Sequence, residues 1–98
     1  MALQPARTIL DSAARPRLPR HIKLRHDATR GIWTILAPER VFTPDPIAVA
    51  VLQLCDGARD VTAIASELAR TYEADAGQIL GDILPMLQDL ADKGVVVA

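Results

Sequence analysis

The chain has 98 residues, half of them apolar, and a net charge of −1. This length fits one compact domain, and no apolar run approaches the ~18 residues that indicate a membrane span. The three aromatic residues are Trp33, Phe42 and Tyr72, so the core is expected to be aliphatic. With Cys55 as the single cysteine and no apolar segment typical of a secretory signal near the N-terminus, we expect a cytoplasmic protein.

The charges are divided unevenly along the chain. Residues 1–40 carry eight Arg or Lys against three Asp or Glu, giving +5, whereas residues 41–98 carry three against nine, giving −6. Such an asymmetry suggests that the two halves face each other, within one chain or between two chains. The alternative is two solvated surfaces that differ only in sign.

The N-terminal part of the chain is predicted to be a flexible tail over residues 1–18, followed by one domain over 19–98. The tail mixes Pro, Arg, Ala and Ser without useful periodicity. Ile22 and Leu24 then alternate with Lys23 and Arg25, which is the pattern of a half-buried strand.

Two further strands are predicted after this one. The segment 27–31 is typical of a turn, and residues 32–36 form a strand that is apolar on both faces, so something must cover each side of it. A second turn at 37–40 leads into a short third strand over 40–43.

The pattern then changes to the period of a helix. Asp45 can cap a first helix, with Pro46 in its first position, and Gly57 is predicted to end that helix as a left-handed cap. Asp60 is predicted to cap a second helix. The apolar stripe predicted to be buried on that helix consists of Val61, Ile64, Leu68 and Tyr72.

A third helix is predicted from Asp75, which begins a capping-box pattern, to Gly94. Pro85 falls inside it and is expected to produce a kink. Residues 95–97 are three valines that can add a short terminal strand. Strands first and helices after predict an α+β domain, a three-stranded antiparallel sheet packed on three short helices.

The polar residues do not converge on a catalytic or metal site. His21 and His26 are five residues apart in a predicted strand and point to opposite faces, and no cysteine or carboxylate cluster completes a metal shell. Cys55 has apolar neighbours, which is typical of a small buried side chain. We therefore predict no catalytic residue, no metal and no cofactor.

Nucleic acid binding is also disfavoured. Three helices beside a small sheet are compatible with a winged helix-turn-helix, but that architecture needs a basic recognition helix. The predicted third helix instead carries Asp75, Asp82, Asp89 and Asp92 against Lys93. We predict a protein that binds neither nucleic acid nor membrane.

Four segments in succession resemble the PqqD family of pyrroloquinoline quinone biosynthesis. They are LPRHIKLRHD, GIWTILAPERVF, LQLCDGARDVTAIASELARTY and DILPMLQDLADKGVV, and together they span about residues 15–97. LAPER at a turn, LCDG closing the first helix and LADKG closing the third are the most telling pieces. None of them is a catalytic signature, and the resemblance rests on their order and spacing.

The resemblance implies a winged-helix-like fold and a role as a recognition element for a ribosomally made peptide. PqqD-like proteins bind the precursor peptide PqqA and deliver it to PqqE, a radical S-adenosylmethionine enzyme. By position, the resemblance implies a peptide site formed by the third strand and the third helix. Its residues are Arg40, Val41, Phe42, Thr43, Ile79, Asp82, Ile83, Met86 and Leu87. Pro85 in that helix departs from the expected pattern.

Two alternatives stay open at this stage. One is a protein-interaction module that binds and regulates an enzyme partner without carrying a peptide. The other concerns assembly: if the stiff joint at residues 43–46 straightens, the basic hairpin can reach the acidic helices of a second copy, giving a homodimer by hairpin exchange.

Overall fold

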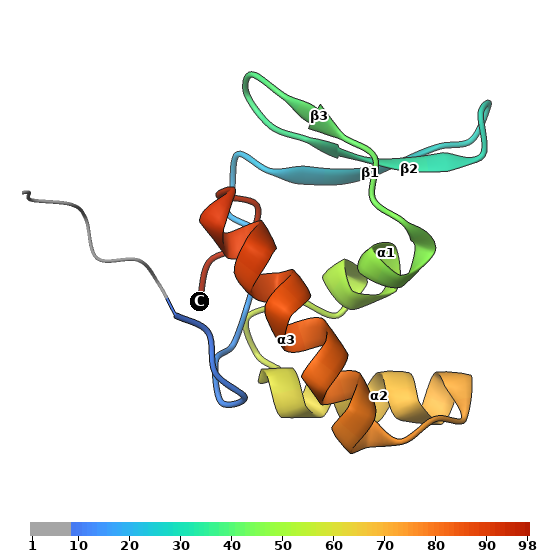
Figure 1. Ribbon diagram of the computed structural model, residues 1–98. Coiled ribbons are helices and arrows are strands. Elements are labelled where there is room, and N and C mark those ends of the chain that lie inside the picture. The colour runs from blue at the N-terminus through green and yellow to red at the C-terminus, as the bar shows by residue number, and fades with distance from the viewer. Residues whose placement is uncertain (1–8) are drawn as a thin grey trace, which may run out of the picture.

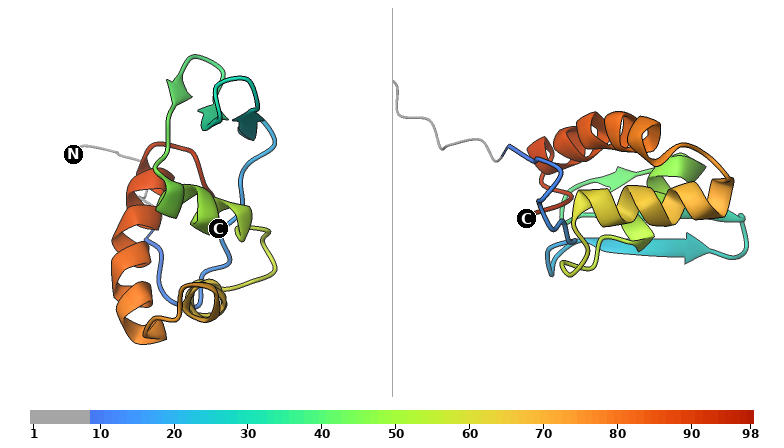
Figure 2. Two further views of the ribbon diagram at one scale, coloured as in Figure 1. Left: turned by 90° about the vertical axis from the view of Figure 1, so that its right-hand side faces the viewer. Right: turned by 90° about the horizontal axis from the view of Figure 1, so that it is seen from below.

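The computed structural model describes residues 9–98. A small antiparallel sheet is followed by three helices, and the helices all lie on the same side of the sheet (Figures 1 and 2). The predicted α+β class and element order are therefore confirmed. The elements are β1 (Lys23–Asp27), β2 (Ile32–Leu36), β3 (Val41–Phe42), α1 (Pro46–Gln53), α2 (Val61–Tyr72) and α3 (Ala76–Asp92).

The sheet has the order β1-β2-β3, so β3 lies at one edge. Ile35 pairs with Leu24 on one side and Phe42 on the other, and these three side chains share the face toward the helices. Ile35 is 1% exposed, which anchors the sheet on the core. β3 is shorter than the predicted strand over 40–43, because Arg40 belongs to the tight turn that precedes it.

The three helices begin at the three predicted caps. The side chains of Asp45, Asp60 and Asp75 accept hydrogen bonds from the backbone N–H groups three residues later, at 2.7, 2.8 and 2.9 Å. Each carboxylate satisfies an N–H that has no partner inside its helix. These local signals were sufficient to place the helix starts.

The predicted end of α1 is wrong. The helix ends at Gln53 with Leu54 as a right-handed cap, and Gly57 lies in the following loop. Gly57 does have a positive φ of 78°, but it serves tertiary packing. Its N–H donates to the Pro16 carbonyl at 3.0 Å, and a Cβ here would lie 3.4 Å from the side chain of Arg17.

The helix α3 is continuous across Pro85. Proline removes the hydrogen bond to the carbonyl four residues earlier, which here belongs to Gly81. Both residues are exposed, so water can reach that carbonyl. Gly94, with a φ of 78°, follows the end of the helix as predicted.

Residues 9–18, which we call the N-terminal strap, are docked on the helices. The carbonyls of Ala14 and Ser12 accept the N–H groups of Val61 and Thr62 at 3.0 and 3.1 Å, at the free start of α2. Leu10 is 5% exposed. The strap therefore differs from the predicted flexible tail, of which residues 1–8 lie outside the described part of the chain.

The C-terminal valines pack under the same strap. Val95 and Val96 are 0% and 1% exposed. Val97 and Arg17 exchange two backbone hydrogen bonds of 2.8 and 2.9 Å, an isolated bridge rather than an added strand of the sheet. The two ends of the described chain thus hold each other.

The core is aliphatic, as the composition predicts, and lies mainly among the helices. Three members of the predicted α2 stripe, Val61, Ile64 and Leu68, are buried, but Tyr72 is 53% exposed. That part of the prediction is wrong because α2 ends at Tyr72 and the chain turns away through Glu73, in the left-handed region. Within residues 9–98, no helix has the length and apolar character needed to cross a membrane.

Candidate functional site

The outer edge of β3 carries backbone groups that the sheet does not use. Ala37 and Arg40 exchange hydrogen bonds of 2.9 and 3.4 Å across the turn. Pairing in an antiparallel ladder alternates, so Val41, opposite Leu36, occupies the next position without mutual hydrogen bonds. The N–H and C=O of Val41 therefore point away from β2. This open edge can accept one more strand.

The side chains of the predicted strand site point in different directions. Val41 is 65% exposed, whereas Phe42 is half-buried and packs against the core. The Arg40 guanidinium lies 5.4 Å from the centre of the Phe42 ring, in a cation–π arrangement that holds it beside the strand. Thr43 is exposed.

The five predicted residues of α3 divide into two groups. Ile83 and Leu87 are 2% and 0% exposed, so they belong to the core. Ile79 and Met86 are half-buried at its border, and Asp82 is exposed. In this structure the accessible wall of the site on α3 consists of Ile79, Asp82 and Met86.

An apolar hollow of about 340 Å³ lies between the three helices. Ile47 and Ala50 line it from α1, and Ile79, Asp82 and Ile83 line it from α3. Its volume is sufficient to receive one or two apolar side chains of a guest. The aspartate is the charged group on its rim.

Two exposed residues at this hollow, Ile47 and Tyr72, were missed by the sequence prediction. They are 54% and 53% exposed. One sequence signal does point to Ile47: residues 46–52 are all apolar, so the helix is hydrophobic around its whole circumference. A helix of that kind needs contacts beyond a single buried face.

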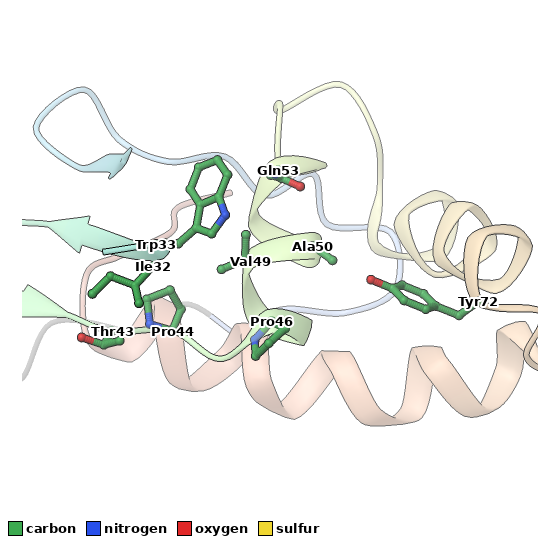
Figure 3. Close-up of a pocket in the computed structure, with 10 residues that line it drawn as sticks. Ile32, Trp33, Thr43, Pro44, Pro46, Val49, Ala50, Gln53 and Tyr72 are labelled. Carbon is green, nitrogen blue, oxygen red and sulfur yellow. The ribbon is translucent and has the colours of Figure 1, made fainter. Parts of the chain in front are cut away.

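A second hollow, of about 390 Å³, lies on the other side of α1 (Figure 3). Trp33 lies between β2 and α1, and Tyr72 reaches from the end of α2 toward Ala50. Pro44 and Pro46 line the side where the sheet joins the helices. Ala50 and Tyr72 line both hollows, so the two adjoin across α1.

Cys55 and His26 lie in separate surroundings, and each has its own contacts. Cys55 is 7% exposed, its thiol donates to the Val51 carbonyl at 3.3 Å, and burial raises its pKa to about 12. A thiol of that kind is a core side chain rather than a nucleophile. His26 packs against Trp33 with the two rings tilted by 45° and 4.9 Å between ring centres. No group of three metal-ligating side chains occurs among residues 9–98.

The arrangement therefore suits binding of an extended chain. Backbone groups at the edge of β3 and an apolar hollow among the helices form the pattern of a peptide site. The family model for coenzyme PQQ synthesis protein D (PqqD) matches residues 33–96, which include β2, β3 and all three helices.

This chain belongs to the PqqD family.

Relatives named PqqA binding protein support the assignment. That of Rhodopseudomonas palustris (strain BisB5) is 62% identical over 85 residues, which cover 87% of this chain and 83% of the relative. The bifunctional coenzyme PQQ synthesis protein C/D of Methylorubrum extorquens is 53% identical over 81 residues, covering 83% of this chain and 22% of that protein. A PqqD domain thus also occurs fused to a second pathway component.

Two solved PqqD structures share the fold. The solution NMR structure of the PqqD truncation of Methylobacterium extorquens PqqCD, a functional and stand-alone RiPP recognition element, has a TM-score of 0.79 and 48% identity. The match covers 91% of this chain and 95% of that one. The crystal structure of PqqD from Xanthomonas campestris has a TM-score of 0.58 and 37% identity, covering 83% and 90%.

Proposed function

We propose that this PqqD-family chain binds the precursor peptide PqqA and presents it to the radical S-adenosylmethionine enzyme PqqE in pyrroloquinoline quinone biosynthesis. The observation that carries the proposal is the outward-facing N–H and C=O of Val41 at the open edge of β3, together with the apolar hollow among the helices. The peptide lies as a fourth strand along β3, with side chains reaching the hollow at Ile47 and Ile79. Relatives named PqqA binding protein support the identity of the guest.

The energetics require both parts of this site. A backbone hydrogen bond contributes only about 1 kcal/mol net, so the open edge alone gives weak affinity. Burial of one Leu-sized guest side chain in the hollow adds about 1.5–3 kcal/mol. Arg40, beside the edge, suits a guest carboxylate, and Asp82, at the rim, suits a guest cation.

In this proposal the chain acts by holding and positioning its guest in the cytoplasm, without catalysis of its own. The buried thiol of Cys55 and the dispersed histidines support that view. Residues 43–46 join the sheet to the helices. We further propose that exchange of the hairpin between two copies gives a homodimer.

Titration of synthetic PqqA into the ¹⁵N-labelled chain tests the proposal. The amide shifts are expected to change over residues 40–43 and 79–87 and at Ile47. Val41→Pro removes the outward N–H while leaving the ladder to β2 intact, and should weaken binding about fivefold or more. Val41→Ala is the matched control, because it keeps the N–H and removes only the side chain.

The paired variants give a clear contradiction. If Val41→Pro, shown to be folded by its amide spectrum, binds PqqA as well as Val41→Ala does, the guest does not pair with β3. If wild-type protein shows no shift changes with PqqA while still binding PqqE, the chain is a module that regulates the enzyme without carrying a peptide.

A further inference from the structure

The sheet has a second face, which turns away from the helices. The register places Lys23, Leu36 and Val41 in one row across the three strands, and Arg25 opposite Thr34 in the next row. Side chains alternate between faces, so these residues lie opposite the face that Ile35 buries. We call them the outer sheet face.

This face is uncovered within the described part of the chain. Figure 2 shows no element above the sheet on that side. Leu36 and Val41 are absent from the apolar residues that pack against the core, although Leu24 and Phe42, their neighbours on the inner face, are among them. The outer sheet face therefore presents two apolar side chains that do not pack on the core, Leu36, which is half-buried, and Val41, which is 65% exposed.

The charges on this face are positive. Lys23 and Arg25 are exposed, and neither forms an ion pair in the described residues. Asp27 is the carboxylate at the far end of the face. It accepts hydrogen bonds from the N–H groups of residues 29 and 30 at 3.1 and 3.2 Å, within the turn that follows β1. A hollow of about 470 Å³ lies on this face and is lined in part by Arg25, Thr34 and Leu36.

We propose that the outer sheet face docks the peptide-modifying enzyme, through an acidic patch that contains apolar residues on the enzyme. The inference rests on the proposed function and names the surface that the enzyme partner uses. Complementary charge selects an acidic partner, and Leu36 and Val41 supply the apolar centre of the contact. A nucleic acid fits less well, because the centre of the face has no aromatic residue for base stacking.

The geometry allows peptide and enzyme to bind at the same time. A guest strand added beside β3 lies in the plane of the sheet and leaves the outer sheet face free. Val41 serves both contacts: its backbone faces the guest and its side chain faces the enzyme. The two partners thus meet at one strand, which places the held peptide next to the enzyme surface.

Charge reversal at Arg25 tests this surface with purified PqqE. Arg25→Glu is expected to weaken PqqE binding about tenfold or more, with a loss that shrinks as salt is raised. Arg70→Glu is the matched control, because it makes the same charge change on an exposed residue of α2, away from the sheet, and should stay within about twofold. Both variants should bind PqqA as wild type does, again within about twofold.

The readouts separate this inference from the proposed function. If Arg25→Glu, and also Lys23→Glu, bind PqqE like Arg70→Glu, the outer sheet face is not the docking surface, although PqqA binding stands. If wild-type protein binds no PqqA, the proposed function fails whatever Arg25 does. Arg25-dependent RNA binding without PqqE binding would also overturn the docking surface.

Discussion

The helical layer and the sheet differ in how many residues each contributes to the buried core. In the described residues, Ile35 is the strand residue that belongs to the fully buried core, whereas the helices, the N-terminal strap and the terminal valines supply nearly all the rest. The sheet keeps an open edge and an uncovered face. The buried core is thus concentrated in the helices, whereas the sheet supplies the open edge and the uncovered face. Substitutions in the sheet can alter binding at little cost to folding.

The largest expected difference between the two regions is thiol reactivity. In a Val41→Cys variant, the new cysteine on the sheet should react with iodoacetamide about a thousandfold faster at pH 8 than Cys55 in the helical layer. A pKa of about 12 leaves ~1 in 10,000 thiols ionised at that pH, whereas an ordinary value of 9.0 leaves ~1 in 10. Mass spectrometry of timed samples measures both rates.

The same thiol gives a direction for stability against pH. The folded chain keeps the Cys55 proton at pH values where the unfolded chain loses it, so this contribution to stability falls as the pH rises from about 9 toward about 12. In the iodoacetamide experiment, equal reaction rates at positions 41 and 55 of the native Val41→Cys variant would show that the helical layer opens as readily as the sheet.

The next largest effect is a truncation in the helical core. Leu87→Ala should lower the free energy of unfolding by about 2–5 kcal/mol, because Leu87 is 0% exposed and its loss leaves a cavity. Val41→Ala, on the sheet, should stay within about 0.5 kcal/mol. Urea denaturation measures both. A smaller loss of unfolding free energy for Leu87→Ala would instead indicate that Leu87 contacts the peptide and contributes little to the core.

The smallest contrast concerns two aspartates that make similar hydrogen bonds. Asp60→Ala should cost about 1 kcal/mol of global stability, because it removes the cap of α2. Asp27→Ala removes two bonds in the turn between β1 and β2, and should mainly speed amide hydrogen exchange in that hairpin. Equal global losses for the two variants would mean that the hairpin and helices unfold as one unit.

The features predicted correctly from sequence are those with local causes. Asp45, Asp60 and Asp75 cap helices through N–H groups three residues away, so the signal and the structure lie in one short window. The edge position of β3 follows equally from its short length and the tight turn before it. Such features require no knowledge of distant contacts.

The features predicted wrongly depend on distant contacts. The N-terminal strap has no periodicity of its own, and it is ordered by α2 and the C-terminal valines. Gly57 has the expected positive φ, but its neighbour in space is Arg17, forty residues earlier in the chain. The hollow at Ile47 needs three helices to form, so no single segment predicts it.

One sequence expectation turns into a functional clue. The strand at 32–36 is apolar on both faces, which predicts cover on each side, yet the helices cover only one side among the described residues. Leu36 shares the other side with Val41, which lies opposite it. The side of β2 that stays uncovered belongs to the outer sheet face, which we propose as the docking surface for a second protein.

The alternation of hydrogen bonding along β3 also sets the ways in which a guest can slide. Val41 is the residue of β3 whose N–H and C=O face outward. The proposed guest strand can therefore shift past it by two residues, ~7 Å, but a shift by one reverses which of its side chains face the helices. A threading error of one residue would therefore be rejected by the hollow at Ile47. The distance from the docking site to the residues to be modified can thus change only in two-residue steps.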